Sequence, residues 1–231
     1  MPDKWIERDL DLKVKDILSQ ADIFHEKYYS SETFSGPSLH FHHRAIALEC
    51  TNWTEKVEIV YAVLASWGMH RMGTNGSKMQ SFSSFEKSIS SVRPEIEKLR
   101  KAVPRNLLLS DWQTLERVFK RIKVMASGTT IVGNSKVLAH FIPNLIAPID
   151  REYTLNYLFG SKMFQNGLDR EWLLMCKIHR EFYYSISDNK DFQNKTESWM
   201  SNSRLYPWDT SVLKIIDNLV IGAMRKKNDS D

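Results

Sequence analysis

Residues 129–153 read TTIVGNSKVLAHFIPNLIAPIDREY, and this stretch decides the fold that we expect for the chain. Its Gly-Asn-Ser triplet at 133–135 is typical of a tight turn, and apolar residues with helical spacing follow. We expect a helix over 135–142 that ends before a proline, because proline cannot continue a helix. A Pro-Ile-Asp-Arg segment at 148–151 then introduces a second helix over 151–159. The stretch therefore predicts short helices joined by turns.

Helical spacing also recurs on both sides of this stretch. We expect helices over 6–19, 38–48, 52–67, 81–100, 112–125, 171–185, 192–200 and 209–224. Pro94 lies inside one of these segments and predicts a kink or a division into two pieces. Strand signals are nearly absent. The sequence therefore predicts an all-α protein, a helical orthogonal bundle.

The chain is 231 residues long with 42% apolar residues, which is enough for a sizeable core. It fits a single helical domain, or two lobes that share a cleft. The lobes would comprise 1–105 with the C-terminal helices, and 106–165. Cys50 and Cys176 lack metal-type spacing, so we expect free thiols in a reducing compartment. No segment has 18 uncharged apolar residues, and we expect a cytoplasmic protein without a membrane span, metal or cofactor.

The 133–135 turn has a possible chemical use. A tight glycine turn exposes the first N–H groups of the helix that follows it, and these groups bind phosphate together with the helix dipole. Lys136 would add a positive charge beside Gly133, Asn134 and Ser135. The formal net charge of +4 is compatible with nucleic acid or with another acidic partner. We therefore interpret this turn as a DNA backbone contact without base readout.

The stretch resembles the helix-hairpin-helix superfamily of base-excision DNA glycosylases. The residues VGNSKVLA look like the hairpin and its second helix, and PIDR looks like the segment that carries an aspartate. The resemblance implies that Lys136 attacks C1′ of a sugar to form a Schiff base. It implies that Asp150 deprotonates this amine or stabilises the oxocarbenium-like sugar. Arg151 follows Asp150 and would lie near the DNA.

The match covers about 25 residues and departs from the family pattern. The chain has one glycine where the usual hairpin has two, and Asp150 lies 14 positions after Lys136. A structural interpretation competes with the functional one. In it, Gly133 is a residue at a helix end, Asp150 is an ordinary N-cap, and Lys136 is a solvated lysine.

Two further segments carry candidate ligand-binding residues. The loop at 69–80 holds His70, Arg71 and Lys78 among glycines, and a helix start follows it, which suits phosphate contact. The segment SLHFHHR places His40 and His43 on one helical face, where they could line a cleft, and directs His42 elsewhere. The basic run that contains Lys120 and Arg121 precedes the turn at 133–135 and would flank bound DNA.

Three functional hypotheses follow. The first is a protein that binds double-stranded DNA, with base-excision chemistry at Lys136 and Asp150. The second is a non-enzymatic interaction domain that binds another protein through aromatic and methionine side chains. The third is an enzyme for a small or phosphorylated substrate that uses His40, His43, His70 and Arg71; it ranks last, because no complete catalytic set is visible in the sequence.

Overall fold

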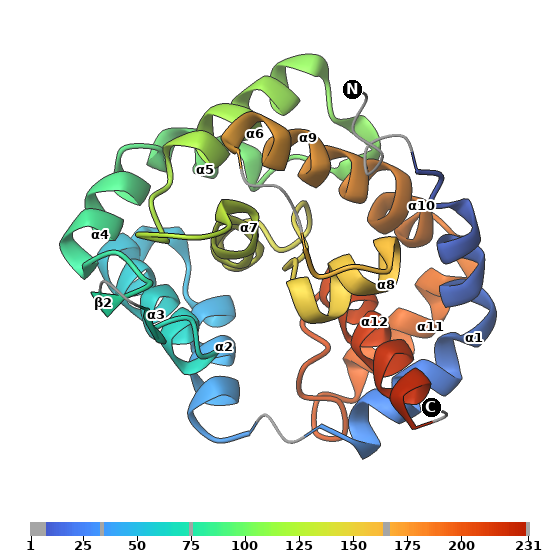
Figure 1. Ribbon diagram of the computed structural model, residues 1–231. Coiled ribbons are helices and arrows are strands. Elements are labelled where there is room, and N and C mark those ends of the chain that lie inside the picture. The colour runs from blue at the N-terminus through green and yellow to red at the C-terminus, as the bar shows by residue number, and fades with distance from the viewer. Residues whose placement is uncertain (1–7, 33–34, 74–75, 164–166, 230–231) are drawn as a thin grey trace. The chain divides into compact units, whose positions relative to one another are not determined.

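The computed structural model describes residues 8–32, 35–73, 76–163 and 167–229, and these residues form an all-α protein (Figure 1). The predicted all-α class is confirmed. The described strands are the two-residue pair β1 (Met72–Gly73) and β2 (Gly76–Ser77), which pair antiparallel within the predicted 69–80 loop. No helix among the described residues is both long and apolar enough to cross a membrane.

The chain divides into two compact units, and each is described by itself. Unit 1 comprises Met1–Thr33, Ala147–Gln165 and Leu173–Asp231, and unit 2 comprises Phe34–Ile146 and Asn166–Trp172. The lobe boundary expected near residue 105 therefore falls inside unit 2. The N-terminal segment and the C-terminal helices belong to one unit, whereas most of the chain between them belongs to the other.

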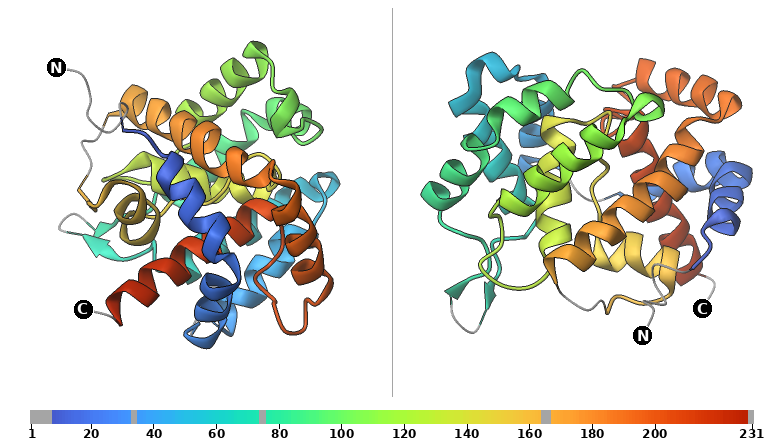
Figure 2. Two further views of the ribbon diagram at one scale, coloured as in Figure 1. Left: turned by 90° about the vertical axis from the view of Figure 1, so that its right-hand side faces the viewer. Right: turned by 90° about the horizontal axis from the view of Figure 1, so that it is seen from above.

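Unit 1 is built around helix α1 (Asp11–Ser30), which packs along α12 (Val212–Asn228) (Figures 1 and 2). Gly222 makes this close approach possible, because a Cβ atom there would lie 2.0 Å from the carbonyl oxygen of Phe24. The other elements of unit 1 are η3 (Arg151–Leu155), α8 (Asn156–Phe159), the end of α9 (Leu168–Ile178), η4 (His179–Tyr183), α10 (Tyr184–Ser187) and α11 (Lys190–Ser201). Both η3 and η4 are π-helical turns, a rare conformation.

Unit 2 has a core formed by α2 (Pro37–Ala47), α3 (Trp53–Ser66) and α7 (Thr130–Phe141), which contact one another. The pair α5 (Arg93–Leu99) and α6 (Leu109–Arg121) packs together beside it. The remaining elements are η1 (Cys50–Asn52), α4 (Phe82–Ser90), η2 (Pro104–Asn106) and the start of α9.

Several local predictions are confirmed. The segment at 81–100 is two helices, α4 and α5, and Pro94 lies in the first turn of the second, where its missing N–H is tolerated. Ser81 caps α4, because its hydroxyl accepts a hydrogen bond from the N–H of Ser84. The prediction for the helix after residue 129 is wrong in its start, and that difference bears directly on the candidate site.

Candidate functional site

The glycine turn predicted at residue 133 is absent. Helix α7 begins at Thr130 and runs through Gly133 without interruption. The glycine in the left-handed conformation is Gly128, with φ of 91°, two residues before the helix. Gly133 instead permits close packing, because a Cβ atom there would lie 3.0 Å from side-chain atoms of Val124 and Met125. The hairpin prediction is therefore wrong at this position.

The N-terminus of α7 is occupied by a carboxylate of the protein. The N–H of Ile131 donates to Oε2 of Glu171 at 2.6 Å, and the N–H of Gly167 donates to Oε1 at 3.2 Å. Glu171 is buried, at 1% exposure. A carboxylate at a helix N-terminus satisfies the N–H groups and the dipole that would otherwise attract phosphate. Glu171 therefore fills the kind of anion site that the sequence predicted for DNA.

Residues 133–135 are buried within unit 2 and do not form an exposed phosphate site. Both described hydrogen bonds of the Asn134 amide run inward, because Nδ2 donates to the carbonyl of Phe119 at 2.7 Å and to that of Ile122 at 3.2 Å. Ser135 is fully buried. Asn134 thus ties α7 to the end of α6. These contacts correct the prediction that Gly133, Asn134 and Ser135 contact a DNA backbone as a hairpin.

Lys136 is also buried, at 9% exposure, so it is not the solvated lysine of the structural interpretation. Its Nζ atom lies 5.7 Å from the ring centroid of Trp67, the residue that directly follows α3, in a cation–π arrangement. Nδ1 of His140 donates to the carbonyl of Lys136 at 2.7 Å. The amine therefore belongs to a cluster of aromatic side chains.

A histidine pair completes this cluster. Nδ1 of His42 lies 3.0 Å from Nε2 of His140, and both rings are buried. Because Nδ1 of His140 donates to a carbonyl, Nε2 of the neutral ring accepts and His42 donates. The sequence predicted that His40 and His43 could line a cleft and that His42 points elsewhere. In the structure His40 and His43 are exposed, whereas His42 is buried. The pairing of His42 with His140 has no local sequence signal, since the two residues are 98 positions apart.

Asp150 lies in unit 1 and caps the π-helical turn η3. Its Oδ1 accepts from the N–H of Glu152 at 2.7 Å, and its own N–H donates to Oγ1 of Thr154 at 3.0 Å. The structural interpretation of Asp150 as an N-cap is thus confirmed. Arg151 donates through Nε to the carbonyl of Lys162 at 2.8 Å. Lys136 belongs to unit 2, whereas Asp150 belongs to unit 1.

The other residues that were predicted to contact DNA lie in unit 2, and their surroundings differ. Nδ1 of His70 donates to the carbonyl of Ala65 at 2.7 Å, and Arg71 and Lys78 are exposed. Lys120 forms ion pairs with Asp169 and Glu116, which raise its pKa. Arg121 lies 3.8 Å from Glu95. The loop at 69–80 and the end of α6 are therefore surface elements, although Lys120 and Arg121 already have acidic neighbours.

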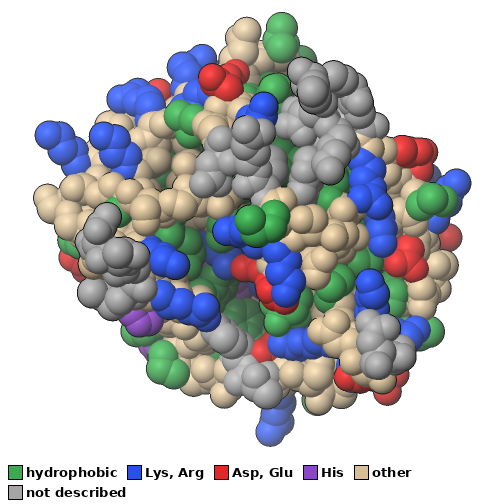
Figure 3. Space-filling view, in the orientation of Figure 1, with side chains coloured by type: hydrophobic (Ala, Val, Ile, Leu, Met, Phe, Trp, Pro, Cys, Tyr) green, Lys and Arg blue, Asp and Glu red, His purple; other side chains and the backbone are tan. Residues whose placement is uncertain are grey.

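Charge is distributed unequally between the two units. Unit 2 contains 16 Lys and Arg residues against 10 Asp and Glu residues, a formal net charge of +6. Unit 1 contains 16 against 18, a net charge of −2. Lys and Arg side chains project over α4, α5 and α6 in the space-filling view (Figure 3). The exposed basic residues of α5, α6 and the segments that flank them are Lys98, Arg100, Lys101, Arg105, Arg117, Arg121 and Lys123; we call this surface the α5–α6 basic face.

Sequence reasoning missed a buried polar network in unit 1. Asp209 accepts hydrogen bonds from His25, Tyr29 and Asn218, and the amine of Lys214 lies 2.8 Å from Oδ2 of Asp217. His25 and Asp209 are 184 positions apart in the sequence, so no motif could have indicated the pair. Buried networks of this kind are costly unless every member is satisfied.

Comparison with known proteins gives no relative: no family model, curated protein or solved structure matches the chain.

Proposed function

We propose that unit 2 binds double-stranded DNA through its phosphate backbone, at the α5–α6 basic face. The observation that carries this proposal is the segregation of charge, +6 on unit 2 against −2 on unit 1. A basic surface on one part of a protein attracts polyanions and steers their approach. The chain as a whole has a net charge of only +4, and this single value conceals the difference between the two units.

The arrangement of the basic residues supports backbone binding. Arg117 and Arg121 are one helical turn apart on α6, and exposed Lys123 follows the end of that helix. Two residues of this face have an acidic neighbour: Glu95 lies 3.8 Å from Arg121, and Asp111 lies 3.8 Å from Lys98. Exposed ion pairs of this kind are weak and exchange readily with phosphate. Sequence-independent affinity with a steep salt dependence follows from such contacts.

Fluorescence anisotropy with a labelled duplex, measured across a range of salt concentrations, tests the proposal. The triple variant Lys101→Glu, Arg117→Glu, Lys123→Glu should weaken binding about tenfold or more and flatten the salt dependence by about three phosphate contacts. The matched control Lys15→Glu, Lys190→Glu, Arg204→Glu makes the same charge change on exposed residues of unit 1. Equal losses in both variants would contradict a specific role for the basic face, and salt-insensitive binding would contradict backbone contact.

Base-excision chemistry at Lys136 is a second candidate function. Its support is the burial of the amine against Trp67 beside the His42–His140 pair, because nucleophilic lysines act from desolvated, aromatic-lined sites. In this reaction the amine attacks C1′ of an abasic sugar, and loss of water gives an imine. Residues 133–135 are buried and Glu171 caps α7, so DNA would not be held by a hairpin at these residues as it is in the glycosylase superfamily.

Borohydride trapping on duplexes with an abasic site tests this chemistry, because reduction turns the imine into a stable amine link. The adduct should form with the natural sequence and with Lys190→Gln, a change at an exposed lysine of unit 1, and should be lost in Lys136→Gln. An adduct that survives in Lys136→Gln would contradict the assignment of the nucleophile. If neither an adduct nor duplex binding is found, the interaction domain becomes the favoured function. The exposed side chains of Leu108 and Leu109 would then be a first surface to test.

A further inference from the structure

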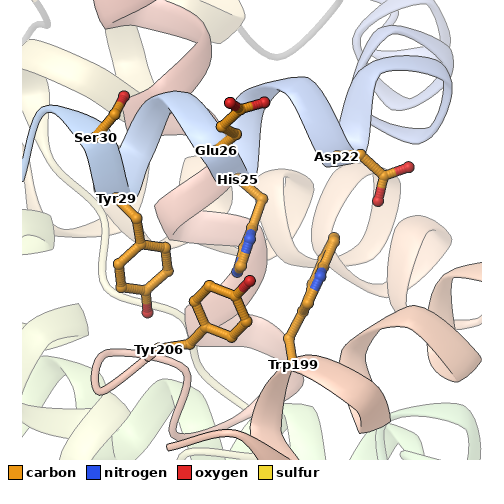
Figure 4. Close-up of a pocket in the computed structure, with 7 residues that line it drawn as sticks. All are labelled: Asp22, His25, Glu26, Tyr29, Ser30, Trp199 and Tyr206. Atoms are coloured by element: carbon orange, nitrogen blue, oxygen red, sulfur yellow. The ribbon is translucent and has the colours of Figure 1, made fainter. Parts of the chain in front are cut away.

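A pocket with a volume of about 410 Å³ lies on unit 1, between one face of α1 and the end of α11 with the turn that follows it (Figure 4). Residues 22, 25, 26, 29 and 30 follow the pattern i, i+3, i+4, i+7, i+8, so they share a face of the helix. The volume is within the range of small-molecule sites. The lining residues are Asp22, His25, Glu26, Tyr29, Ser30, Trp199 and Tyr206.

Four rings form one wall of this pocket. The rings of His25 and Trp199 are stacked, with centroids 4.0 Å apart and an interplanar angle of 6°. Tyr206 meets His25 edge to face at 4.6 Å, and Tyr29 lies 5.0 Å from Tyr206 (Figure 4). Trp199, Tyr206 and Tyr29 are half-buried, so solvent reaches part of each ring. The wall offers aromatic surface to a ligand.

The buried carboxylate of Asp209 holds this wall in place. Its Oδ2 atom lies 2.7 Å from Nε2 of His25, and its Oδ1 accepts from Tyr29 Oη–H at 2.9 Å and from the Asn218 amide at 2.8 Å. Burial, together with the charge of Asp209, raises the pKa of the Tyr29 phenol, so this ring stays neutral. A wall fixed by hydrogen bonds needs little reorganisation when a ligand binds.

The charge of the pocket selects the class of ligand. Asp22 and Glu26 carry exposed carboxylates, and no Lys or Arg is among the described residues that line the pocket. Asp22 and Trp199 both line the pocket (Figure 4). Aromatic faces attract cations through the ring quadrupole, and adjacent carboxylates add to this attraction. A neutral apolar ligand would use the rings but gain nothing from the carboxylates.

We propose that this pocket binds a small organic cation, with an ammonium or methylated ammonium group against the aromatic wall and close to Asp22. This site is independent of the DNA-binding function proposed for unit 2. Lys195 on α11 pairs with the carboxylate of Asp22. The protein's own ammonium group therefore competes for the carboxylate that a ligand would use.

Titration of the full chain with choline, followed by ¹H–¹⁵N correlation spectra, tests the proposal. Choline should shift the indole N–H signal of Trp199, assigned with Trp199→Phe, with a Kd on the order of 1 mM or tighter. The probe 3,3-dimethyl-1-butanol has the same shape without the charge and should bind about fivefold more weakly or worse. Equal binding of the two probes would overturn the proposal, and so would the absence of any shift with choline.

Charge variants locate the cation. The double variant Asp22→Asn, Glu26→Gln on α1 should weaken choline binding about fivefold or more. The control Asp191→Asn, Glu197→Gln removes the same charge from α11, at residues that do not line the pocket, and should leave binding within about twofold. Lys195→Gln should strengthen binding, because the competing ammonium is gone. All four carboxylates are exposed, so these variants should fold. Equal effects of the two double variants, or weaker binding in Lys195→Gln, would overturn the proposed position.

Discussion

Nε2 of His179 accepts a hydrogen bond from the N–H of Ala147 at 3.0 Å, while its Nδ1 donates to the carbonyl of Met175 at 2.8 Å. The ring is fully buried in unit 1, and Tyr183 from the same π-helical turn donates to the carbonyl of Pro148 at 3.3 Å. Together they fix the segment that leads to Asp150. Because one nitrogen donates and the other accepts, the ring must be neutral.

This arrangement predicts a loss of stability in acid. Burial lowers the pKa of His179 to about 4, against about 6.5 in an unfolded chain. Between these two pH values the unfolded state therefore binds more protons than the folded state. The contribution of His179 to the free energy of unfolding is fully present above about pH 6.5 and is lost as the pH falls towards 4, by up to about 3 kcal/mol. Urea unfolding at several pH values should show this loss. The difference between the natural sequence and His179→Gln should shrink in acid, whereas exposed His70→Gln should retain the full pH dependence.

Lys56 predicts a change at alkaline pH. This lysine is 2% exposed, its Nζ donates to the carbonyl of Leu48 at 2.8 Å, and burial lowers its pKa to about 8. Because the folded pKa is below the unfolded value of about 10.4, stability should rise between pH 8 and about 10.4. Lys56→Met should abolish that rise, which urea unfolding at pH 7 and pH 10 measures. An unchanged rise in the variant would show that another group is responsible.

Glu171 predicts a dependence of unit 2 on one carboxylate. Glu171→Gln keeps the shape of the side chain but turns an NH₂ group towards one of the two backbone N–H donors. Loss of one charge-assisted hydrogen bond in a buried site should lower the free energy of unfolding by about 1–3 kcal/mol. Chemical denaturation measures this change. The exposed control Glu58→Gln should change stability by less than about 0.5 kcal/mol.

Two helical glycines should respond differently to alanine. Gly222→Ala places Cβ 2.0 Å from a backbone oxygen of α1, which cannot move without separating α1 from α12, so we expect a loss of about 3 kcal/mol or more. In Gly133→Ala the new Cβ atom meets only side-chain atoms, at 3.0 Å. The helix propensity of alanine is better than that of glycine by about 1 kcal/mol, which offsets the cost of displacing these side chains. Thermal unfolding compares the two variants. Similar losses in both would contradict the distinction between backbone and side-chain contacts.

Local sequence predicted the helical elements because their signals are local. Apolar spacing located most of the helices, Pro94 divided one segment into α4 and α5, and Ser81 marked a helix start. Asp150 was correctly considered as an N-cap. Gly133 was misjudged, since a glycine that permits close packing and a glycine that forms a turn look alike in sequence.

Sequence alone therefore determined the all-α class and the positions of most helices, since propensity, periodicity and capping act over a few residues. Tertiary structure decided the rest. The pairs His42–His140 and His25–Asp209 join residues 98 and 184 positions apart, and the α7 cap comes from Glu171, 40 residues downstream. The charge difference between the units also depends on which distant segments fold together. Sites of this kind arise from long-range packing, for which a single sequence carries no local signal.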